Sequence, residues 1–100
     1  GEPFDAVFGN NDEMALGAIQ AMKAAGISMD DVVVGGVDAT SDALLSMSAG
    51  EMDVTVFQDL AGQGAGSIET AMALVNGEAV DKTVFIPFKL VTPADLADFQ

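Results

Sequence analysis

The stretch from Asp5 to Gly26, DAVFGNNDEMALGAIQAMKAAG, decides the fold of this chain of 100 residues. Its first residues, Asp5–Gly9, are short and apolar, which is typical of a buried parallel strand. Asn10 and Glu13 then have the form of a capping box, and the final glycine stands where a helix-ending glycine belongs. The segment Asn11–Ala25 between them carries apolar side chains at helical spacing. The stretch therefore predicts a strand that leads directly into a helix.

The same alternation of strand and helix continues through the rest of the chain. Apolar runs rich in β-branched residues predict strands at Val32–Val37 and Val54–Phe57. Helical periodicity predicts helices at Ser41–Ala49 and Ala61–Val75. Val84–Val91 is extended, but Pro87 interrupts it, so an edge, bent or crossing segment is expected. Thr92 and Pro93 predict the start of a last helix. Alternation of this kind predicts an α/β fold with a parallel sheet and right-handed crossovers.

The composition excludes several classes of function. Sixteen Asp and Glu face three basic residues, a net charge of −13, which argues against nucleic acid and against anionic membrane surfaces. The chain has no Cys and no His, so it offers no disulfide, none of the usual zinc ligand sets and no base for a Ser-His-Asp triad. We therefore expect no catalytic residues, no metal site and no cofactor. The chain opens on Gly-Glu-Pro without a Met or a signal peptide, which looks like the middle of a longer protein.

Polar residues follow each of the first three predicted strands. Ligands of open parallel sheets bind beyond the carboxyl ends of the strands, so these side chains converge on one rim if the strands are neighbours. Amides and carboxylates suit sugar hydroxyls, because each hydroxyl both donates and accepts. The same residues also suit helix N-caps or solvent-facing positions, and spacing alone leaves both interpretations open. The residues are Asn10, Asn11 and Asp12 after the first strand, Asp38 after the second, and Gln58 with Asp59 after the third.

Four segments together resemble the ribose-type periplasmic binding proteins, the substrate-binding proteins of sugar ABC transporters. Asp5–Gly26 resembles the strand-to-helix signature of that family, and Val32–Asp38 resembles its next strand, which ends in an Asp. Ala49–Gln58 is similar to the third strand and its Gln, and Phe88–Thr92 to the last strand. The likeness covers essentially the whole chain. It implies a three-layer, Rossmann-like lobe of a type I periplasmic binding protein, in the C-terminal portion of that protein.

The resemblance also implies a function and a site. Asn11, Asp38 and Gln58 match the family's ligand-binding Asn, Asp and Gln. Residues 1–58 and 88–100 would belong to the C-terminal lobe, while residues 59–87 would form a hinge crossing and a helix that packs on a missing N-terminal lobe. The expected protein is an exported, periplasmic receptor that binds a sugar or polyol between two lobes and delivers it to an ABC transporter permease. Ala39 departs from the pattern, because the family often has Gly after the Asp.

Two other functions remain open on the sequence. A lactose-repressor-like transcription regulator shares this fold in its effector-binding domain and would carry a basic DNA-binding headpiece upstream. An α/β enzyme or another flavodoxin-like protein is the third possibility, but the chain offers little machinery for catalysis. For the leading interpretation, we expect these residues on their own to bind sugar weakly or not at all, because sheet edges and apolar faces would be uncovered.

Overall fold

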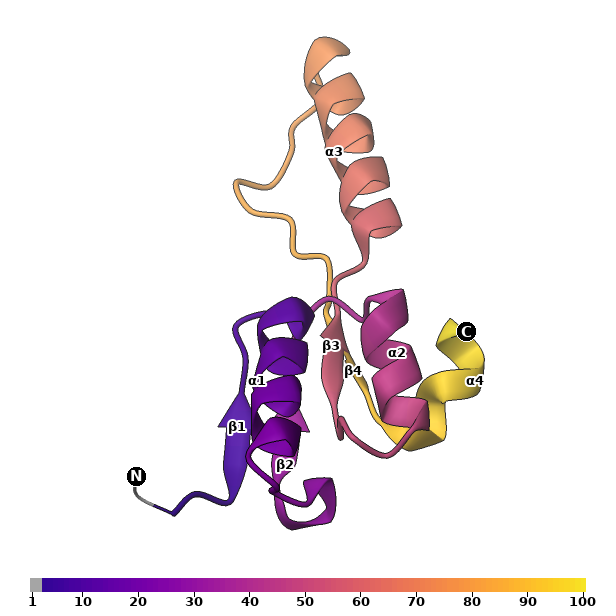
Figure 1. Ribbon diagram of the computed structural model, residues 1–100. Helices are drawn as coiled ribbons and strands as arrows, with labels where there is room; N and C mark the ends of the chain where they lie inside the picture. Colours follow the sequence, from indigo (N-terminus) through magenta and orange to yellow (C-terminus); the bar gives the residue numbers. More distant parts are fainter. Residues whose placement is uncertain (1–2) are drawn as a thin grey trace. The chain divides into compact units, whose positions relative to one another are not determined.

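The computed structural model describes residues 3–100, which divide into two compact units. The first unit runs up to Phe57 and resumes at Leu90–Gln100, and the second is Gln58–Lys89. Figure 1 shows the elements of both along the chain. The predicted alternation of strands and helices is confirmed in the first unit, and its strands are shorter than the apolar runs that predict them.

Three strands of the first unit lie side by side. β1 (Ala6–Phe8) pairs in parallel with β2 (Val33–Gly35), with Val7 opposite Val34. β3 (Thr55–Phe57) continues this arrangement through a parallel bridge between Gly35 and Val54 and a bond from the Gly36 N–H to the Val54 carbonyl, 3.1 Å. β4 (Lys89–Val91) pairs with β3. The parallel neighbours that the sequence predicts are therefore present.

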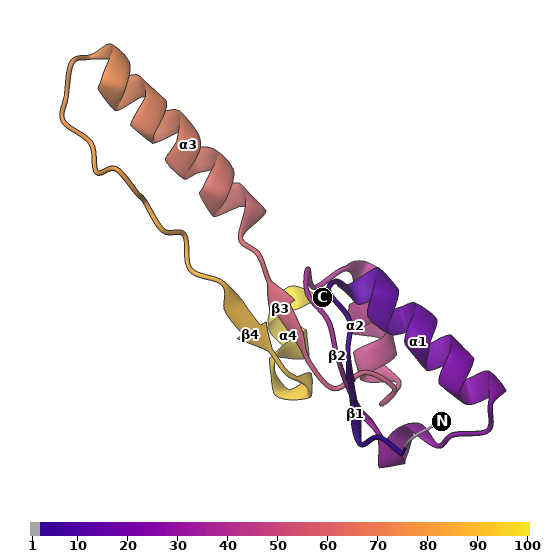
Figure 2. The same ribbon diagram turned by 90° about the vertical axis from the view of Figure 1, so that its left-hand side faces the viewer.

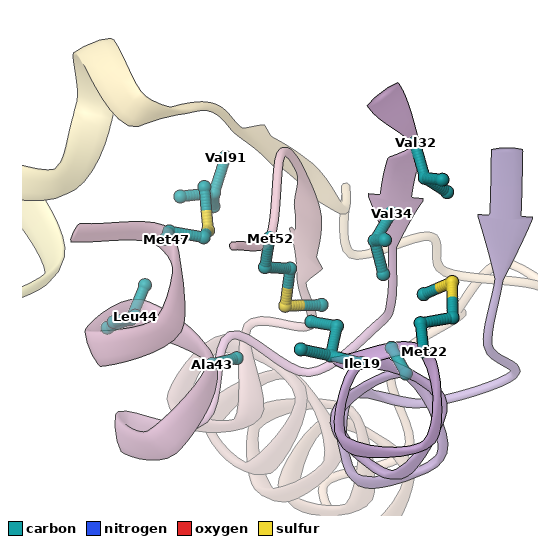
Figure 3. Packing of buried hydrophobic residues seen from close by; sticks show 10 residues of the cluster. Ile19, Met22, Val32, Val34, Ala43, Leu44, Met47, Met52 and Val91 are labelled. Atoms are coloured by element: carbon teal, nitrogen blue, oxygen red, sulfur yellow. The ribbon is translucent and has the colours of Figure 1, made fainter. Parts of the chain in front are cut away.

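Helices α1 (Asp12–Ala24) and α2 (Ser41–Ser48) supply most of the core of the first unit. Figure 3 shows their side chains meeting those of the β2 segment, of Met52 and of Val91. Residues on the other side of the β1–β2 pair are exposed, among them Phe8 and Val33. The buried apolar residues are Ala15, Ile19, Met22, Val32, Val34, Ala43, Leu44, Met47, Met52 and Val91.

Short helices complete the first unit. A 3-10 turn that the sequence pattern did not predict, Met29–Asp31, leads into β2. The predicted last helix appears as a 3-10 turn, Pro93–Asp95, followed by α4 (Leu96–Phe99). The predicted start at Thr92 is confirmed, because its N–H donates to the Asp95 carboxylate at 2.9 Å. The ring of Phe99 meets that of Phe57 edge to face, with 5.2 Å between the ring centroids.

The second unit consists of one helix and one extended segment. Helix α3 (Leu60–Val75) starts with the Asp59 side chain as its N-cap, which accepts from the Gly62 N–H at 2.8 Å. The chain then returns along the helix without regular structure until β4 begins, as Figure 2 shows. Only the last three residues of the predicted extended run, from Lys89 on, are strand. Helix α3 has no buried residue, so this unit has no core of its own.

Candidate ligand-binding site

Backbone hydrogen bonds join the carboxyl ends of β1, β2 and β3. The Asp12 N–H, beyond β1, donates to the Val37 carbonyl at 2.8 Å, and the Asp38 N–H, beyond β2, donates to the Val56 carbonyl at 2.8 Å. A third bond runs from the Gly9 N–H to the Gly35 carbonyl at 2.9 Å. The loops that carry Asn11 and Asp38 therefore lie together at one edge of the parallel strands, where ligands of such sheets bind.

Asn11 is the N-cap of α1. Its Oδ1 accepts from the Met14 N–H at 2.9 Å, and its backbone is extended, as an N-cap requires. The predicted capping box at Asn10 and Glu13 is wrong by one residue. The reason is that the Asp12 N–H is already taken by Val37, so the helix begins at Asp12 and the cap falls on the residue before it. Only the Oδ1 of Asn11 is used in this cap, which leaves its amide nitrogen as a donor for a ligand.

Asp38 and Ala39 form a turn of unusual backbone geometry in the loop that follows β2. Their φ angles are +122° and +54°, and they are the non-glycine residues with positive φ in residues 3–100. Side chains rarely adopt such angles, because the Cβ atom crowds the backbone. Strained backbone persists only where the surroundings impose it, and it clusters at ligand-binding sites. The departure from the family pattern at Ala39 therefore falls on a position whose conformation favours glycine.

Asp12 is one of the polar residues predicted after the first strand, but the sequence patterns did not predict that it is buried. Its side chain is fully buried, at 0% exposure. One carboxylate oxygen accepts from the Thr55 hydroxyl at 2.6 Å, and the other accepts from the Thr40 N–H at 2.8 Å. This carboxylate therefore connects the start of α1 to the loop after β2 and to β3. Its place on the helix was the available signal, since Asp12 shares the buried face of α1 with Ala15, Ile19 and Met22.

Two glycines allow the helix to start this close to the strands. A Cβ on Gly9 would lie 2.6 Å from the Ala15 nitrogen, and a Cβ on Gly36 would lie 2.5 Å from the Asp12 Oδ1. Real Cβ atoms do not come so close to other heavy atoms. Both positions therefore need glycine because of the close approach, although neither has a positive φ.

Gln58, the third predicted ligand residue, follows the last residue of β3 and opens the second unit. It is half-buried and lines a groove of about 590 Å³ that belongs to this unit. The groove lies between α3 and the returning segment, where Gly66 and Ile86 face each other. Its apolar wall includes Phe85 and Phe88, and its polar wall includes Gln63 and Thr70.

The described residues also bear on other kinds of site. Among residues 3–100, no three His, Cys, Asp or Glu side chains are grouped so that they could hold a metal ion. Within the same range, none of the helices combines the length and the apolar character needed to cross a membrane.

Comparison with known proteins places the chain in a family. Residues 1–79 match the family described as "Periplasmic binding protein domain". The whole chain is 66% identical to a stretch of the "Putative rhizopine-binding protein" of Rhizobium meliloti, covering 32% of that protein. It is 42% identical over 86 residues to the ribose import binding protein of Escherichia coli K12, covering 28% of that protein. The chain thus spans about a third of the length of these relatives.

Solved structures agree with the sequence comparison. An ABC transporter solute-binding protein from Bacillus halodurans, with bound myo-inositol, superposes on 98% of this chain with a TM-score of 0.84 and 52% identity. The chain covers 33% of that protein. A Caulobacter myo-inositol binding protein, also with myo-inositol bound, gives a TM-score of 0.82 and 35% identity over 94% of this chain and 32% of that one. The chain therefore belongs to the periplasmic binding protein domain family, and its fold is that of part of a lobe of the type I members.

Proposed function

We propose that this chain is part of a solute-binding receptor that binds a sugar or polyol and delivers it to an ABC transporter permease. The observation that carries the proposal is that the loops with Asn11 and Asp38 lie together at the carboxyl edge of adjacent parallel strands. Their side chains offer an amide nitrogen that donates and a carboxylate that accepts. The relatives support the ligand class, because the proteins that match this chain include ribose- and myo-inositol-binding proteins.

Asn11, Asp38 and Gln58 are the proposed ligand contacts. A carboxylate such as that of Asp38 can accept from two neighbouring hydroxyls of one polyol, and charge-assisted bonds of this kind contribute about 1.5–3 kcal/mol each. The imposed turn at Asp38 supports the assignment, since backbone strain is retained where it positions a functional group. In this proposal the receptor catalyses no reaction, which agrees with a sequence that has neither His nor Cys.

We further propose that the second unit packs on another lobe of the receptor, so that the ligand is enclosed between lobes. The support is the exposure of large apolar side chains throughout Gln58–Lys89, a state that is unfavourable in water. Leu60 is 74% exposed and Phe85 is 87% exposed. We also propose that the receptor acts in the periplasm, and the support is the description of its family as a periplasmic binding protein domain. The proposed partners are therefore a sugar or polyol, the second lobe and a permease.

Calorimetry with myo-inositol and with D-ribose tests the function on the receptor that carries this chain. Asp38→Ala should weaken binding of the preferred solute about 30- to 1000-fold, since two hydroxyls of a solute enclosed between the lobes would lose their acceptor. Asp42→Ala is the matched control, because it removes the same charge from an exposed position four residues away, in the first turn of α2. Unchanged affinity in Asp38→Ala would remove Asp38 from the site, and failure of both solutes and of other polyols to bind would refute the proposed function.

A further inference from the structure

The turn at Asp38 and Ala39 needs an explanation, because a left-handed conformation is unfavourable for residues with a Cβ. Each such residue costs about 1–2 kcal/mol relative to its ordinary conformation. Two of them stand in succession here, and neither is glycine. Contacts around the turn must therefore offset a cost that an isolated peptide would avoid by relaxing.

The backbone N–H groups after Asp38 converge on one buried carboxylate. The Thr40 N–H donates directly to the Asp12 Oδ2 at 2.8 Å. The Ala39 N–H donates to the Thr55 hydroxyl at 3.2 Å, and that hydroxyl donates to the Asp12 Oδ1 at 2.6 Å. Both carboxylate oxygens of Asp12 are thus connected to the turn, one directly and one through Thr55.

The burial of Asp12 makes this arrangement rigid. A carboxylate with 0% exposure cannot be hydrated, so it requires its two donors. If Ala39 relaxed to a right-handed conformation, the N–H groups of Ala39 and Thr40 would turn away and the carboxylate would lose a partner. The free energy lost with a hydrogen bond to a buried charge exceeds the strain energy that Ala39 would release by relaxing, so the left-handed turn is retained.

We infer that Asp12 is a positioning residue, which holds Asp38 and Ala39 in the left-handed turn and so fixes the backbone from which the Asp38 side chain extends. The claim that this turn matters for solute recognition rests on the proposed function. The claim that Asp12 stabilises the left-handed turn does not depend on it. Asp12 makes no contact with ligand in this inference. It acts through the backbone of the β2–α2 loop and through Thr55.

A double-mutant cycle on the receptor that carries this chain tests whether Asp12 holds the turn. In the parent, Ala39→Gly should increase the equilibrium constant for folding about fivefold, because glycine adopts the left-handed conformation without the Cβ penalty. In an Asp12→Ala background the turn is free to relax, no strain remains to be relieved, and Ala39→Gly should change the constant less than about twofold. Equal effects of Ala39→Gly in the two backgrounds would overturn the inference.

Asp53→Ala is the matched control for the cycle. The Asp53 carboxylate also accepts from a backbone N–H of the first unit, that of Val34 at 2.7 Å, but has no bond to the turn. The effect of Ala39→Gly should stay about fivefold in that background. The three-bond HN–Hα coupling of Ala39 gives a direct measure of its φ angle, and it should change in Asp12→Ala and stay constant in Asp53→Ala.

Thr55 supplies a second pair of variants in case Asp12→Ala does not fold. Thr55→Val keeps the shape of the side chain and removes the hydroxyl that connects Ala39 to Asp12. Thr55→Ser keeps the hydroxyl. The Ala39 coupling should change in Thr55→Val and be restored in Thr55→Ser, and an unchanged coupling in Thr55→Val would contradict the inference.

Calorimetry with myo-inositol on the receptor separates this inference from the proposed function. If Ala39 relaxes in Thr55→Val while the parent receptor binds no polyol, the hold on the turn stands and the proposed function fails. If the parent binds myo-inositol and Thr55→Val weakens binding tenfold or more, with recovery in Thr55→Ser, both stand. If Ala39 keeps its coupling in every variant, the inference fails whatever the binding data give.

Discussion

Replacement of Gly36 by Ala adds one methyl group at the point where β2 passes the start of α1. The new Cβ would lie 2.5 Å from the Asp12 Oδ1, 2.7 Å from the Met52 Cε and 3.0 Å from the Asp12 Cα. The Met52 methyl group ends a flexible side chain and can move aside. The Asp12 carboxylate cannot move freely, because Thr40 and Thr55 hold it.

The expected loss of stability follows from these distances. To reach a tolerable contact the carboxylate must withdraw by roughly 0.7 Å, which stretches its short bond to Thr55 beyond good geometry. Weakening a hydrogen bond to a charged group costs about 1.5–3 kcal/mol, and overpacking adds about 1–3 kcal/mol. Partial relaxation of the helix start reduces the sum, so we expect Gly36→Ala to lower the free energy of unfolding by about 2–4 kcal/mol.

Denaturant unfolding of the receptor that carries this chain, followed by far-UV circular dichroism, gives the measurement, because these 100 residues hold no Trp or Tyr that could report on the site by fluorescence. Gly17→Ala is the control with the opposite sign. Gly17 lies inside α1 with nothing within 4 Å of an added Cβ, so alanine there should stabilise the chain by about 1 kcal/mol through helix propensity. A Gly36→Ala variant within about 0.5 kcal/mol of the parent would refute the close-approach argument.

Three further changes have expected outcomes of different size. Met52→Ala should lower the free energy of unfolding by about 2–5 kcal/mol in denaturant titration, because this 1% exposed side chain fills the core. Glu51→Gln should change it by less than about 1 kcal/mol, since the ion pair with Lys23 is exposed to solvent, and a larger loss on the same assay would show a role beyond this pair. Asn11→Ala should lose about 1 kcal/mol of stability through the missing cap whereas Asn11→Ser should retain it, and equal melting temperatures of the two variants would contradict the N-cap assignment.

The sequence predicts the order of elements well, because hydrophobic period and helix termini are local properties. The apolar face of α1 and the strand at Val54–Phe57 both follow from runs of neighbouring residues. The error at Asn10 has a different origin. Both Asn10 and Asn11 are suitable caps, and the choice between them is made by a bond from Asp12 to Val37, 25 residues along the chain. Local pattern carries no information about that bond.

The candidate site shows the same division between local and distant causes. Asn11 and Asp38 are accessible to prediction because parallel strands place their carboxyl ends at one edge. The positive φ angles of Asp38 and Ala39 are not, since the residue types there favour other conformations and distant contacts impose the geometry. The burial of Asp12 escapes prediction for a related reason. An acidic residue in the first turn of a helix is ordinarily a favourable surface residue, and only its partners Thr40 and Thr55 explain its burial.

The carboxylate of Asp12 also sets a condition on how the first unit folds. Its two partners stand 28 and 43 positions further along the chain, so neither bond can form while the strand and helix around Asp12 are alone. Until both partners are in place, burial of the Asp12 carboxylate would leave its charge without hydrogen-bond donors. We therefore expect the first turn of α1 to stay exposed to solvent until then. Docking of α1 is thus coupled to the arrival of β3, and the strand–helix repeats of this unit consolidate together after a slow closure of long loops. During synthesis, we therefore expect α1 to pack fully on the strands only after Thr55 has emerged.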